Sequence, residues 1–459
     1  MKISTAITAV LAVLATPALA QESVPEVVQA VDSGNTAWLL VCSALVMLMT
    51  PGLAFFYAGM VDRKNVVSTL LQNFVALAVV GLLWVSVGYS LAFGEGNAFI
   101  GDMSFFMLDG LIGQVYGDAK VPHYAFMAFQ MMFACIAPAL ITGAIAERVH
   151  FKAWMLLLAL WSLFVYVPIA HWVWASKGWI MADGGLDFAG GLVVHISAGV
   201  AGLVAALMFG KRMNAGDSTP SNDVSMIMLG AALLWFGWFG FNAGSAIAAG
   251  HMAAHAFVTT FIGAAAAMVV WMGVDWFKHS KPTATGAAMG LVVGLVAITP
   301  AAGYVTVSSA MIIGVVSGVI CNLLANFIKT KTHLDDALDV FACHGIGGML
   351  GAIMTGMFAT KLVNPAVTVD GILIGGQTEL FTANLIAVLA VTGYTAVMTY
   401  VLIKIVNVIT PIRVSEEAET AGLDMAVHGE VSRFPDRSTY KEVKEVLILS
   451  KRAAKGRRG

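Results

Sequence analysis

Charged residues are scarce in this sequence. Only 11% of its 459 residues are Asp, Glu, Lys or Arg, whereas 59% are hydrophobic, and the mean hydropathy is +0.84. Soluble domains carry about 25% charged residues, so this chain has too few charges to cover a water-exposed surface of its size. Most of it must therefore lie in lipid. The net charge of -2 also argues against a nucleic-acid partner.

Cysteine is also scarce, and its spacing excludes the usual disulfide and zinc frameworks. The four cysteines, Cys42, Cys135, Cys321 and Cys343, lie in apolar stretches, and none belongs to a CxxC pair. We interpret them as small buried hydrophobic residues. No nucleotide-binding loop or soluble catalytic domain is recognisable. The sequence therefore predicts neither an enzyme nor a pump, and we expect neither a metal nor another cofactor.

The first 20 residues have the pattern of a secretory signal peptide. Lys2 gives a positive start, residues 3–14 are apolar, and Ala18-Leu19-Ala20 forms a small-x-small cleavage site. Removal of residues 1–20 would leave the mature N-terminus outside the cytoplasm. We expect residues 21–410 to form the transmembrane domain and residues 411–459 to form a cytoplasmic C-terminal tail.

Eleven apolar segments are long enough to cross a hydrocarbon layer of about 30 Å. They cover residues 36–61, 66–93, 122–146, 151–177, 186–210, 222–249, 252–276, 283–304, 306–328, 339–361 and 376–409. An odd number of spans places the two ends on opposite sides of the membrane. Positive charges gather in alternate connections, at Arg63, Lys64, Arg148, Lys152, Lys211, Arg212, Lys278, Lys281, Lys329 and Lys331. Because basic residues favour the cytoplasmic side, both features predict an N-out, C-in orientation.

An internal repeat with the pattern D-x7-H-x3-G-x2-G occurs in the fifth and tenth segments. Its copies are Asp187, His195, Gly199 and Gly202, and Asp336, His344, Gly348 and Gly351. Five spans separate the copies, so they run in opposite directions through the membrane. This arrangement is typical of inverted-topology repeats, whose substrate path lies at the repeat interface. The sequence predicts an all-α membrane protein with two five-helix inverted repeats and an eleventh helix.

The two repeated histidines are the leading candidates for function. Ionisable groups within a span usually mark a functional path, and the neighbouring glycines would let the helices approach closely and bring His195 and His344 together. Two facing imidazoles could offer hydrogen bonds to a small polar guest. The alternatives are satisfied packing histidines, or ligands of a haem, although glycine-lined helices favour a narrow gap.

An aromatic group forms the second candidate site. Phe133, Trp174 and Phe241, with Ser245, could hold a partly desolvated cation, because aromatic faces attract positive charge and a hydroxyl accepts a proton. Aromatic residues at membrane ends are more often an interfacial belt. Spacing alone does not decide between the two interpretations.

The acids Asp187 and Asp336 each stand near the start of a repeated helix. There a carboxylate can cap free backbone N–H groups. We favour this structural role over a role as proton carriers.

Several blocks of the sequence together resemble the Amt/Mep/Rh ammonium transporters, and in particular the bacterial Amt branch. They are Met49–Tyr57, Gly88–Gly94, Ala128–Phe133, Gly143–Arg148, Leu186–Gly191, Gly237–Ser245 and Asp339–Gly345. The resemblance covers nearly the whole mature chain. It implies an eleven-helix subunit, a homotrimer, and one pore through each subunit of a multi-pass protein in the bacterial cytoplasmic (inner) membrane.

The resemblance also implies roles for individual residues. Phe133, Trp174, Phe241 and Ser245 match the outer site that recruits ammonium or methylammonium, and Phe133 and Phe241 match the gate below it. His195 and His344 match the twin histidines of the hydrophobic pore. Asp187 matches the carboxylate that supports the recruitment site. Ammonium would be deprotonated at the outer site, and ammonia would pass through the pore.

The C-terminal tail carries a further implied partner. Residues 422–430 resemble the segment through which such transporters meet a PII-type signal protein in regulating nitrogen uptake. Two departures from the family pattern are Ala58, where a second glycine is usual, and the continuation from Val431 to Gly459. The longer tail also suits a rival interpretation, a sensor with little flux. A neutral-gas channel of the Rh type and a membrane redox protein are the other rivals.

Overall fold

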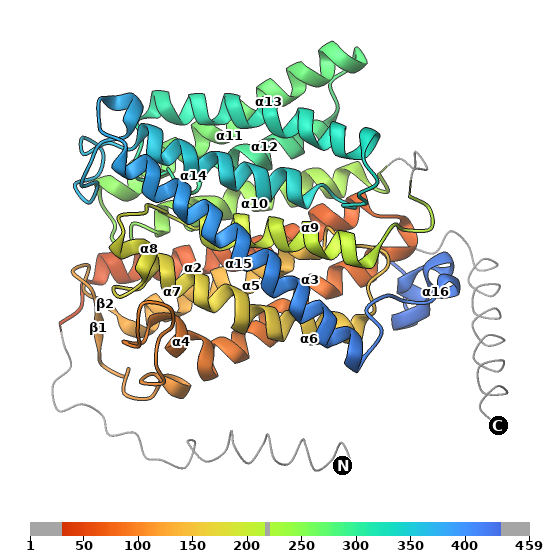
Figure 1. Cartoon of the computed structure of the whole chain (residues 1–459), viewed down its shortest axis with the longest axis horizontal. Helices are drawn as coiled ribbons and strands as arrows, with labels where there is room; N and C mark the ends of the chain where they lie inside the picture. Colours follow the sequence, from red (N-terminus) through yellow and green to blue (C-terminus); the bar gives the residue numbers. More distant parts are fainter. Residues whose placement is uncertain (1–29, 216–220, 433–459) are drawn as a thin grey trace.

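The computed structural model describes residues 30–215 and 221–432, so the predicted signal peptide and the basic end of the tail lie outside the described residues. The described chain is a bundle of helices with one short hairpin (Figure 1). Its α-helices are α2 (Ser33–Met60), α3 (Val66–Leu83), α4 (Tyr89–Phe93), α5 (His123–Ile141), α6 (Phe151–Trp161), α7 (Val167–Trp174), α8 (Trp179–Ala182), α9 (Ser197–Phe209), α10 (Val224–Gly244), α11 (His251–His279), α12 (Ala284–Ile298), α13 (Val307–Lys331), α14 (Gly347–Phe358), α15 (Glu379–Ile409) and α16 (Glu416–Ala421).

Shorter elements connect or extend these helices. The strands β1 (Val115–Tyr116) and β2 (Val121–Pro122) pair in an antiparallel hairpin. Single 3₁₀ turns cover Arg63–Asn65, Phe106–Leu108 and Ile372–Ile374. Wider π-helical turns cover Trp84–Gly88, Ser162–Tyr166, Gly191–Ile196, Phe341–Ile346 and Asp424–His428.

The helices account for the predicted membrane spans. Within the described ranges, ten helical stretches are long and apolar enough to cross a bilayer, and α12 is a shorter apolar helix of 15 residues. They follow the order of the eleven predicted segments, which confirms an all-α, multi-pass architecture. Several apolar runs are longer than their helices: α12 ends at Ile298, although its run continues to 304. The turn after α12 is buried and apolar. The length of the apolar run therefore overestimates the length of the helix.

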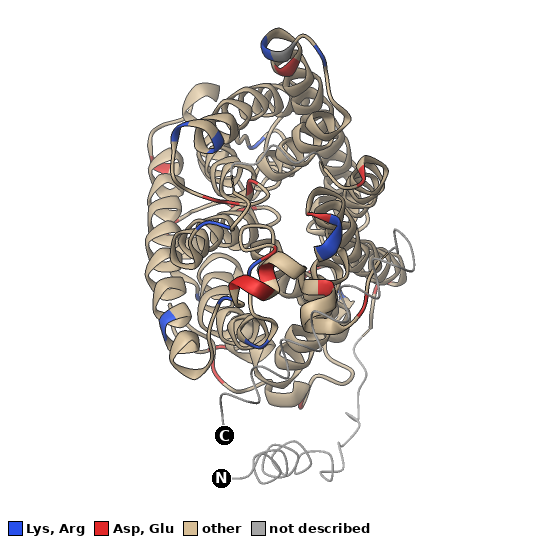
Figure 2. Ribbon diagram, turned by 90° about the vertical axis from the view of Figure 1, so that its right-hand side faces the viewer, with Lys and Arg blue, Asp and Glu red and all other residues tan. Residues whose placement is uncertain are grey.

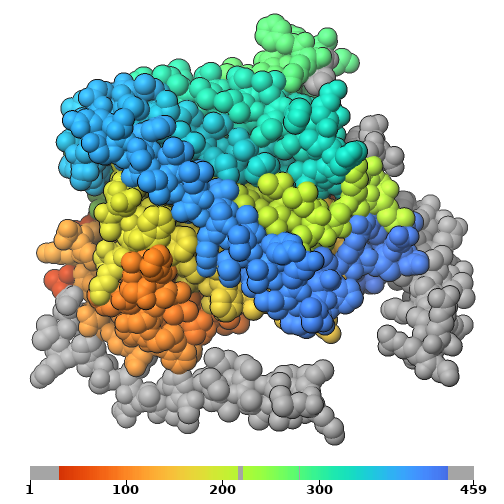
Figure 3. Space-filling model, in the orientation of Figure 1, coloured from red at the N-terminus to blue at the C-terminus, as the bar shows by residue number. Residues whose placement is uncertain are grey.

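The two halves of the chain pack side by side and are bridged by α15. This helix crosses the outside of the bundle obliquely and lies over both halves (Figures 1 and 3), where it contacts α6 and α9 of the first half and α14 of the second. Helix α12 lies deep in the bundle, with residues 286–298 all buried. It contacts α14 and both turns that carry the repeated histidines.

Charged groups lie mainly at the ends of the bundle. Figure 2 looks onto the α16 end, where short charged stretches interrupt a mostly uncharged ribbon. At this end Arg212 pairs with both Glu147 and Asp335, with N–O distances of 2.7 and 2.8 Å. Arg148 is fully buried there and donates to the backbone carbonyl of Asp335 at 2.7 Å. These contacts join loops of the two halves.

The four cysteines are buried and free, as predicted.

The described part of the tail docks on the same end. The Asp424 carboxylate accepts hydrogen bonds from the backbone N–H groups of Val67 and Ser68, at 2.9 and 2.7 Å. The N–H of Leu423 donates to the side-chain oxygen of Asn65 at 2.8 Å. The N–H groups of Val67 and Ser68 lie at the start of α3, where backbone N–H groups have no partner within the helix. The tail therefore supplies the missing cap of α3.

Candidate functional site

The two repeated histidines meet in the interior of the bundle. His195 and His344 are 2% and 4% exposed, and their Nδ1 atoms lie 3.3 Å apart. One of these nitrogens must donate and the other must accept. The Nε2 atom of His195 has no hydrogen-bond partner among the described residues. Whichever tautomer it adopts, this atom is one donor or one acceptor that the described residues leave unused.

The local backbone explains how the histidines are presented. Each lies in a π-helical turn at the start of its helix, Gly191–Ile196 before α9 and Phe341–Ile346 before α14. Each turn follows a residue with positive φ, Gly190 at 112° and Asp339 at 60°, three positions after the repeated aspartate. The sequence repeat thus extends to backbone conformation. Such π-turns are rare and occur frequently at functional sites.

Close helix packing brings the two histidine segments together. A Cβ atom added at Gly199 would lie 2.0 Å from the backbone nitrogen of Gly345, so the two main chains are in contact there. The turn that carries each histidine also packs against the helix of the other copy. This geometry confirms the prediction that glycines allow the two repeated helices to approach.

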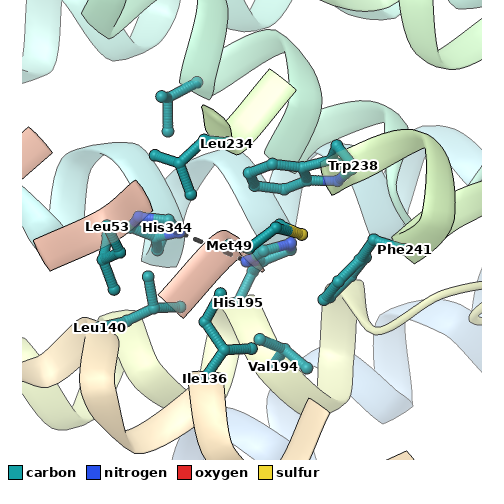
Figure 4. Close-up of a pocket in the computed structure, with 11 residues that line it drawn as sticks. Met49, Leu53, Ile136, Leu140, Val194, His195, Leu234, Trp238, Phe241 and His344 are labelled. Carbon is teal, nitrogen blue, oxygen red and sulfur yellow. Dashed lines mark hydrogen bonds between the residues drawn. The ribbon is translucent and has the colours of Figure 1, made fainter. Parts of the chain in front are cut away.

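The histidine pair borders a small apolar cavity (Figure 4). Its volume is about 10 Å³, close to that of one water-sized sphere. Its lining residues are Met49, Leu53, Ile136, Leu140, Val194, His195, Leu234, Trp238, Phe241, Val292 and His344. The rings of Trp238 and Phe241 stack near His195, with centroids 5.3 and 5.9 Å from its own. A cavity of this size has no room for a haem, so the residues do not fit the redox interpretation.

A second, larger pocket adjoins the aromatic candidates. Its volume is about 110 Å³, and it is lined by Phe93, Tyr116, Phe126, Phe129, Gln130, Phe133, Trp174, Phe188, Ser245 and Ile247. Trp174 stands edge-on to Phe133, with centroids 5.9 Å apart and planes at 86°. The hydroxyl of Ser245 donates to the carbonyl of Phe241 at 2.9 Å, which leaves its oxygen able to accept. The structure thus brings the predicted aromatic and hydroxyl residues together.

A pair of stacked rings lies between the two cavities. The rings of Phe133 and Phe241 are 4.1 Å apart between centroids and 24° apart in orientation. Phe133 lines the larger pocket, and Phe241 lines the histidine cavity. Both side chains are buried. The path from one cavity to the other is therefore closed by this stack in the described conformation.

Asp187 lies beside the larger pocket but points into the backbone. Its carboxylate accepts four N–H groups, from residues 190 to 193, at 2.7–3.2 Å. Its own carbonyl accepts the indole N–H of Trp174 at 3.0 Å. One residue thus fixes the start of the His195 turn and the orientation of Trp174. Its side chain is not among the residues that line either cavity.

Asp336 is the counterpart of Asp187, but it accepts fewer hydrogen bonds. Its Oδ2 accepts the N–H of Phe341 at 2.7 Å, and its Oδ1 has no partner among the described residues. Burial, together with the neighbouring Asp339 carboxylate, raises the pKa of Asp336 from 3.8 to about 7. The folded protein therefore favours the protonated acid below about pH 7.

This pKa shift predicts a pH-dependent contribution to stability. A raised pKa in the folded state gives stability that is fully present below the unfolded value and is lost as the pH rises through about 7. Asp336→Asn should remove this loss. In detergent, the Tm of the wild type should fall more than that of the variant between about pH 5 and pH 8. Equal pH slopes for the two proteins would contradict the assignment.

Sequence reasoning missed three features of the site. The π-turns left no signal, because their residues are as apolar as those of an α-helix. Gln130 lines the outer pocket within the block 128–133 but was not singled out. Tyr116, on the β1 hairpin, stacks on Phe126 at 3.6 Å and 8°. Its position depends on a loop whose path the sequence pattern does not define.

Comparison with known proteins identifies the family. The model of the Ammonium Transporter Family matches residues 37–433. An ammonium transporter of Bacillus subtilis is 48% identical over 399 residues, which cover 86% of this chain and 98% of the relative. Ammonium transporter Amt1 of Archaeoglobus fulgidus is 45% identical over 403 residues, covering 87% of this chain and 99% of the relative.

Solved structures agree with this result. The crystal structure of Saccharomyces cerevisiae Mep2 superposes with a TM-score of 0.79 at 36% identity, covering 84% of this chain and 88% of Mep2. A structure described as a sensor Amt protein gives a TM-score of 0.79 at 28% identity, covering 86% of this chain and 98% of that chain. With the multi-pass fold and the paired histidines, these matches show that the chain belongs to the Ammonium Transporter Family.

Proposed function

We propose that this ammonium transporter recruits ammonium in the outer pocket, where the ion gives up one proton to water on the outer side, and conducts the resulting ammonia past the phenylalanine stack into the histidine-lined cavity. The observation that carries the proposal is the sequence of three elements along one path. An aromatic pocket with a free hydroxyl acceptor is followed by the stack of Phe133 and Phe241 and then by an apolar cavity with two histidines.

The polarity of each element supports this order of events. In the outer pocket, the faces of Phe133 and Trp174 attract a cation, and the oxygen of Ser245 accepts one of its N–H groups. The inner cavity offers little to a charged ion, because its lining is apolar apart from the histidine pair and Trp238. Moving a bare ion into such surroundings is costly, whereas neutral ammonia needs only one or two hydrogen bonds.

The supporting residues fit the same scheme. The Phe133 and Phe241 rings would have to move apart for each molecule, so they act as a gate. His195 and His344 would guide ammonia through the apolar region. Asp187 supports the recruitment site by holding Trp174 and the His195 turn. Potassium cannot lose a proton, so the inner cavity excludes it.

We also propose a homotrimer in a bacterial inner membrane, with the N-terminus outside and a regulatory tail inside. The family resemblance supports the trimer, the membrane and the regulatory tail, whereas the signal-peptide pattern and the alternating positive charges support the orientation. Exposed apolar side chains along α11 and α13, such as Phe257, Phe261 and Phe327, are available to lipid or to neighbouring subunits.

The segment 422–430 would meet a PII-type protein. A sensor function is the second candidate, because the tail is docked directly on the transport domain.

Uptake by the purified protein in proteoliposomes tests the recruitment site. Ser245→Ala should raise the half-saturating ammonium concentration by about tenfold or more, because a hydrogen bond to a charged group is lost. Ser317→Ala is a matched control. Ser317 also donates to the carbonyl four residues before it, at 2.7 Å, but it lies on α13 and lines neither cavity. An unchanged half-saturation in Ser245→Ala would contradict the site. Folded wild-type protein without uptake would favour the sensor function.

A further inference from the structure

A groove at the α16 end of the bundle lies beside the last described residue of the chain. Its volume is about 410 Å³, and its walls come from the start of α3 and the start of α10. Its lining residues are Arg63, Val66, Val67, Leu70, Asn222, Asp223, Met226 and Ser432. Half of them are apolar, and the lining carries one charge of each sign. The groove is therefore large enough for an aromatic side chain and offers it an apolar surface.

The docked tail leads the chain to this groove. The turn Asp424–His428 ends at Gly429, which has a φ of 71° that glycine adopts at no steric cost. The chain then reaches the groove at Ser432. Val67 takes part in both contacts, because its N–H donates to the Asp424 carboxylate at 2.9 Å and the same residue lines the groove. An occupant of the groove would therefore pack against the same turn of α3 that the tail caps.

The sequence after Ser432 suits this surface. It continues as Arg433-Phe434-Pro435-Asp436-Arg437, which lies outside the described residues. Phe434 follows Ser432 by two positions, and two residues of chain span at most about 7 Å, so the aromatic ring is within reach of the groove. Arg433 and Asp436 flank the apolar Phe434-Pro435 pair, and the groove carries both opposite charges.

We propose that residues 433–437 dock in this groove of their own chain, with the ring of Phe434 between α3 and α10, and thereby clamp the tail on the transport domain. The clamp lies beyond the segment 422–430, and it does not depend on how ammonium crosses the protein. Burial of the aromatic ring against Val66, Leu70 and Met226 supplies the driving force. While Phe434 is docked, the contacts of Asp424 with α3 stay closed, and a partner that removes the tail must first displace this ring.

A disulfide assay tests where the segment lies. The four native cysteines are buried, so a variant with Met226→Cys and Phe434→Cys has one accessible pair. Mild oxidation of this full-length protein in detergent should join the two positions within one chain, because a disulfide forms only between neighbouring backbones. Met228→Cys with Phe434→Cys is the matched control. Met228 lies one position beyond Ile227 on the same helix, is 40% exposed, and does not line the groove, so this pair should form little disulfide.

Limited proteolysis tests the clamp without introduced cysteines. Trypsin can cleave after Arg433, inside the proposed segment, and after Lys441, outside it. Phe434→Ala should speed cleavage after Arg433 about tenfold, because proteolysis follows the population of the undocked segment, and should leave cleavage after Lys441 unchanged. Phe434→Leu remains apolar and should keep most of the protection. Tyr440→Ala removes an aromatic side chain outside the segment and should behave as the wild type.

The two assays together decide the proposal. A disulfide within one chain at Met226, with faster cleavage after Arg433 in Phe434→Ala, supports it. A disulfide between two chains overturns it, because the groove then holds the tail of a neighbouring copy. Equal disulfide yields at Met226 and Met228, or cleavage after Arg433 that Phe434→Ala does not change, also overturn it and leave the groove to lipid. Neither assay requires transport, so failure of the proposed transport function would leave this result intact.

Discussion

Asp187→Ala is expected to abolish the folded transporter or destabilise it by roughly 4 kcal/mol or more. The carboxylate accepts four backbone N–H groups at the start of the His195 turn. Each hydrogen bond to a charged acceptor contributes about 1.5–3 kcal/mol, and the reduced cost of burying a charge offsets part of the sum. The measurement is the yield of monodisperse protein and its Tm in detergent.

Asp32→Ala is the control for this prediction. Asp32 also caps a helix, but its side chain accepts one N–H, that of Asn35, at 2.8 Å in an exposed position. Its loss should cost about 1 kcal/mol. Asp187→Ala protein that is as stable as Asp32→Ala would show that the four hydrogen bonds do not organise the site.

Replacing both histidines by leucine is expected to reduce ammonium uptake by roughly a factor of 100. The cavity would then offer no hydrogen bond from an imidazole, and an unpaired polar molecule in an apolar site costs about 1–3 kcal/mol. The substitutions remove buried polar groups at similar side-chain volume, so the Tm should stay equal or rise. Loss of flux without loss of stability distinguishes a conduction role from a packing role.

The control for the histidine pair is His255→Leu. His255 lies on α11 and contacts the carbonyl of Val305 at 2.8 Å, outside both cavities of the proposed path. Uptake by this variant should match the wild type. Near-normal uptake by the His195→Leu, His344→Leu double variant would contradict a guiding role for the pair and restore the interpretation that they are packing residues.

The sequence predicted the histidine pair because a repeat supplied two independent constraints. The spacing of Asp187 and His195, repeated by Asp336 and His344, indicated equivalent places on two oppositely directed helices. The glycines at 199 and 345 then explain how the backbones approach. The order of the spans was also predictable, since the chain has few charges and they are concentrated between apolar runs.

Other features depend on tertiary contacts that no local pattern specifies. A π-turn has the same composition as an α-helix, and what sets it at residues 191–196 is the fourfold acceptance by Asp187 together with the positive φ of Gly190. The docking of residues 422–428 on α3 depends on a pairing of Asp424 with backbone donors that lie more than 350 residues away in the chain. The groove beside Ser432 becomes visible only once α3 and α10 are placed.

An inner cavity that conducts neutral ammonia should reject ions that keep their charge. Transport by wild-type protein in proteoliposomes, with ammonium or potassium supplied at equal concentration on one side, tests it most directly. We predict uptake of ammonium that potassium neither replaces nor inhibits, because the dehydrated potassium ion cannot shed its charge before the apolar cavity. Potassium flux comparable to ammonium flux through the folded wild-type protein would contradict the account.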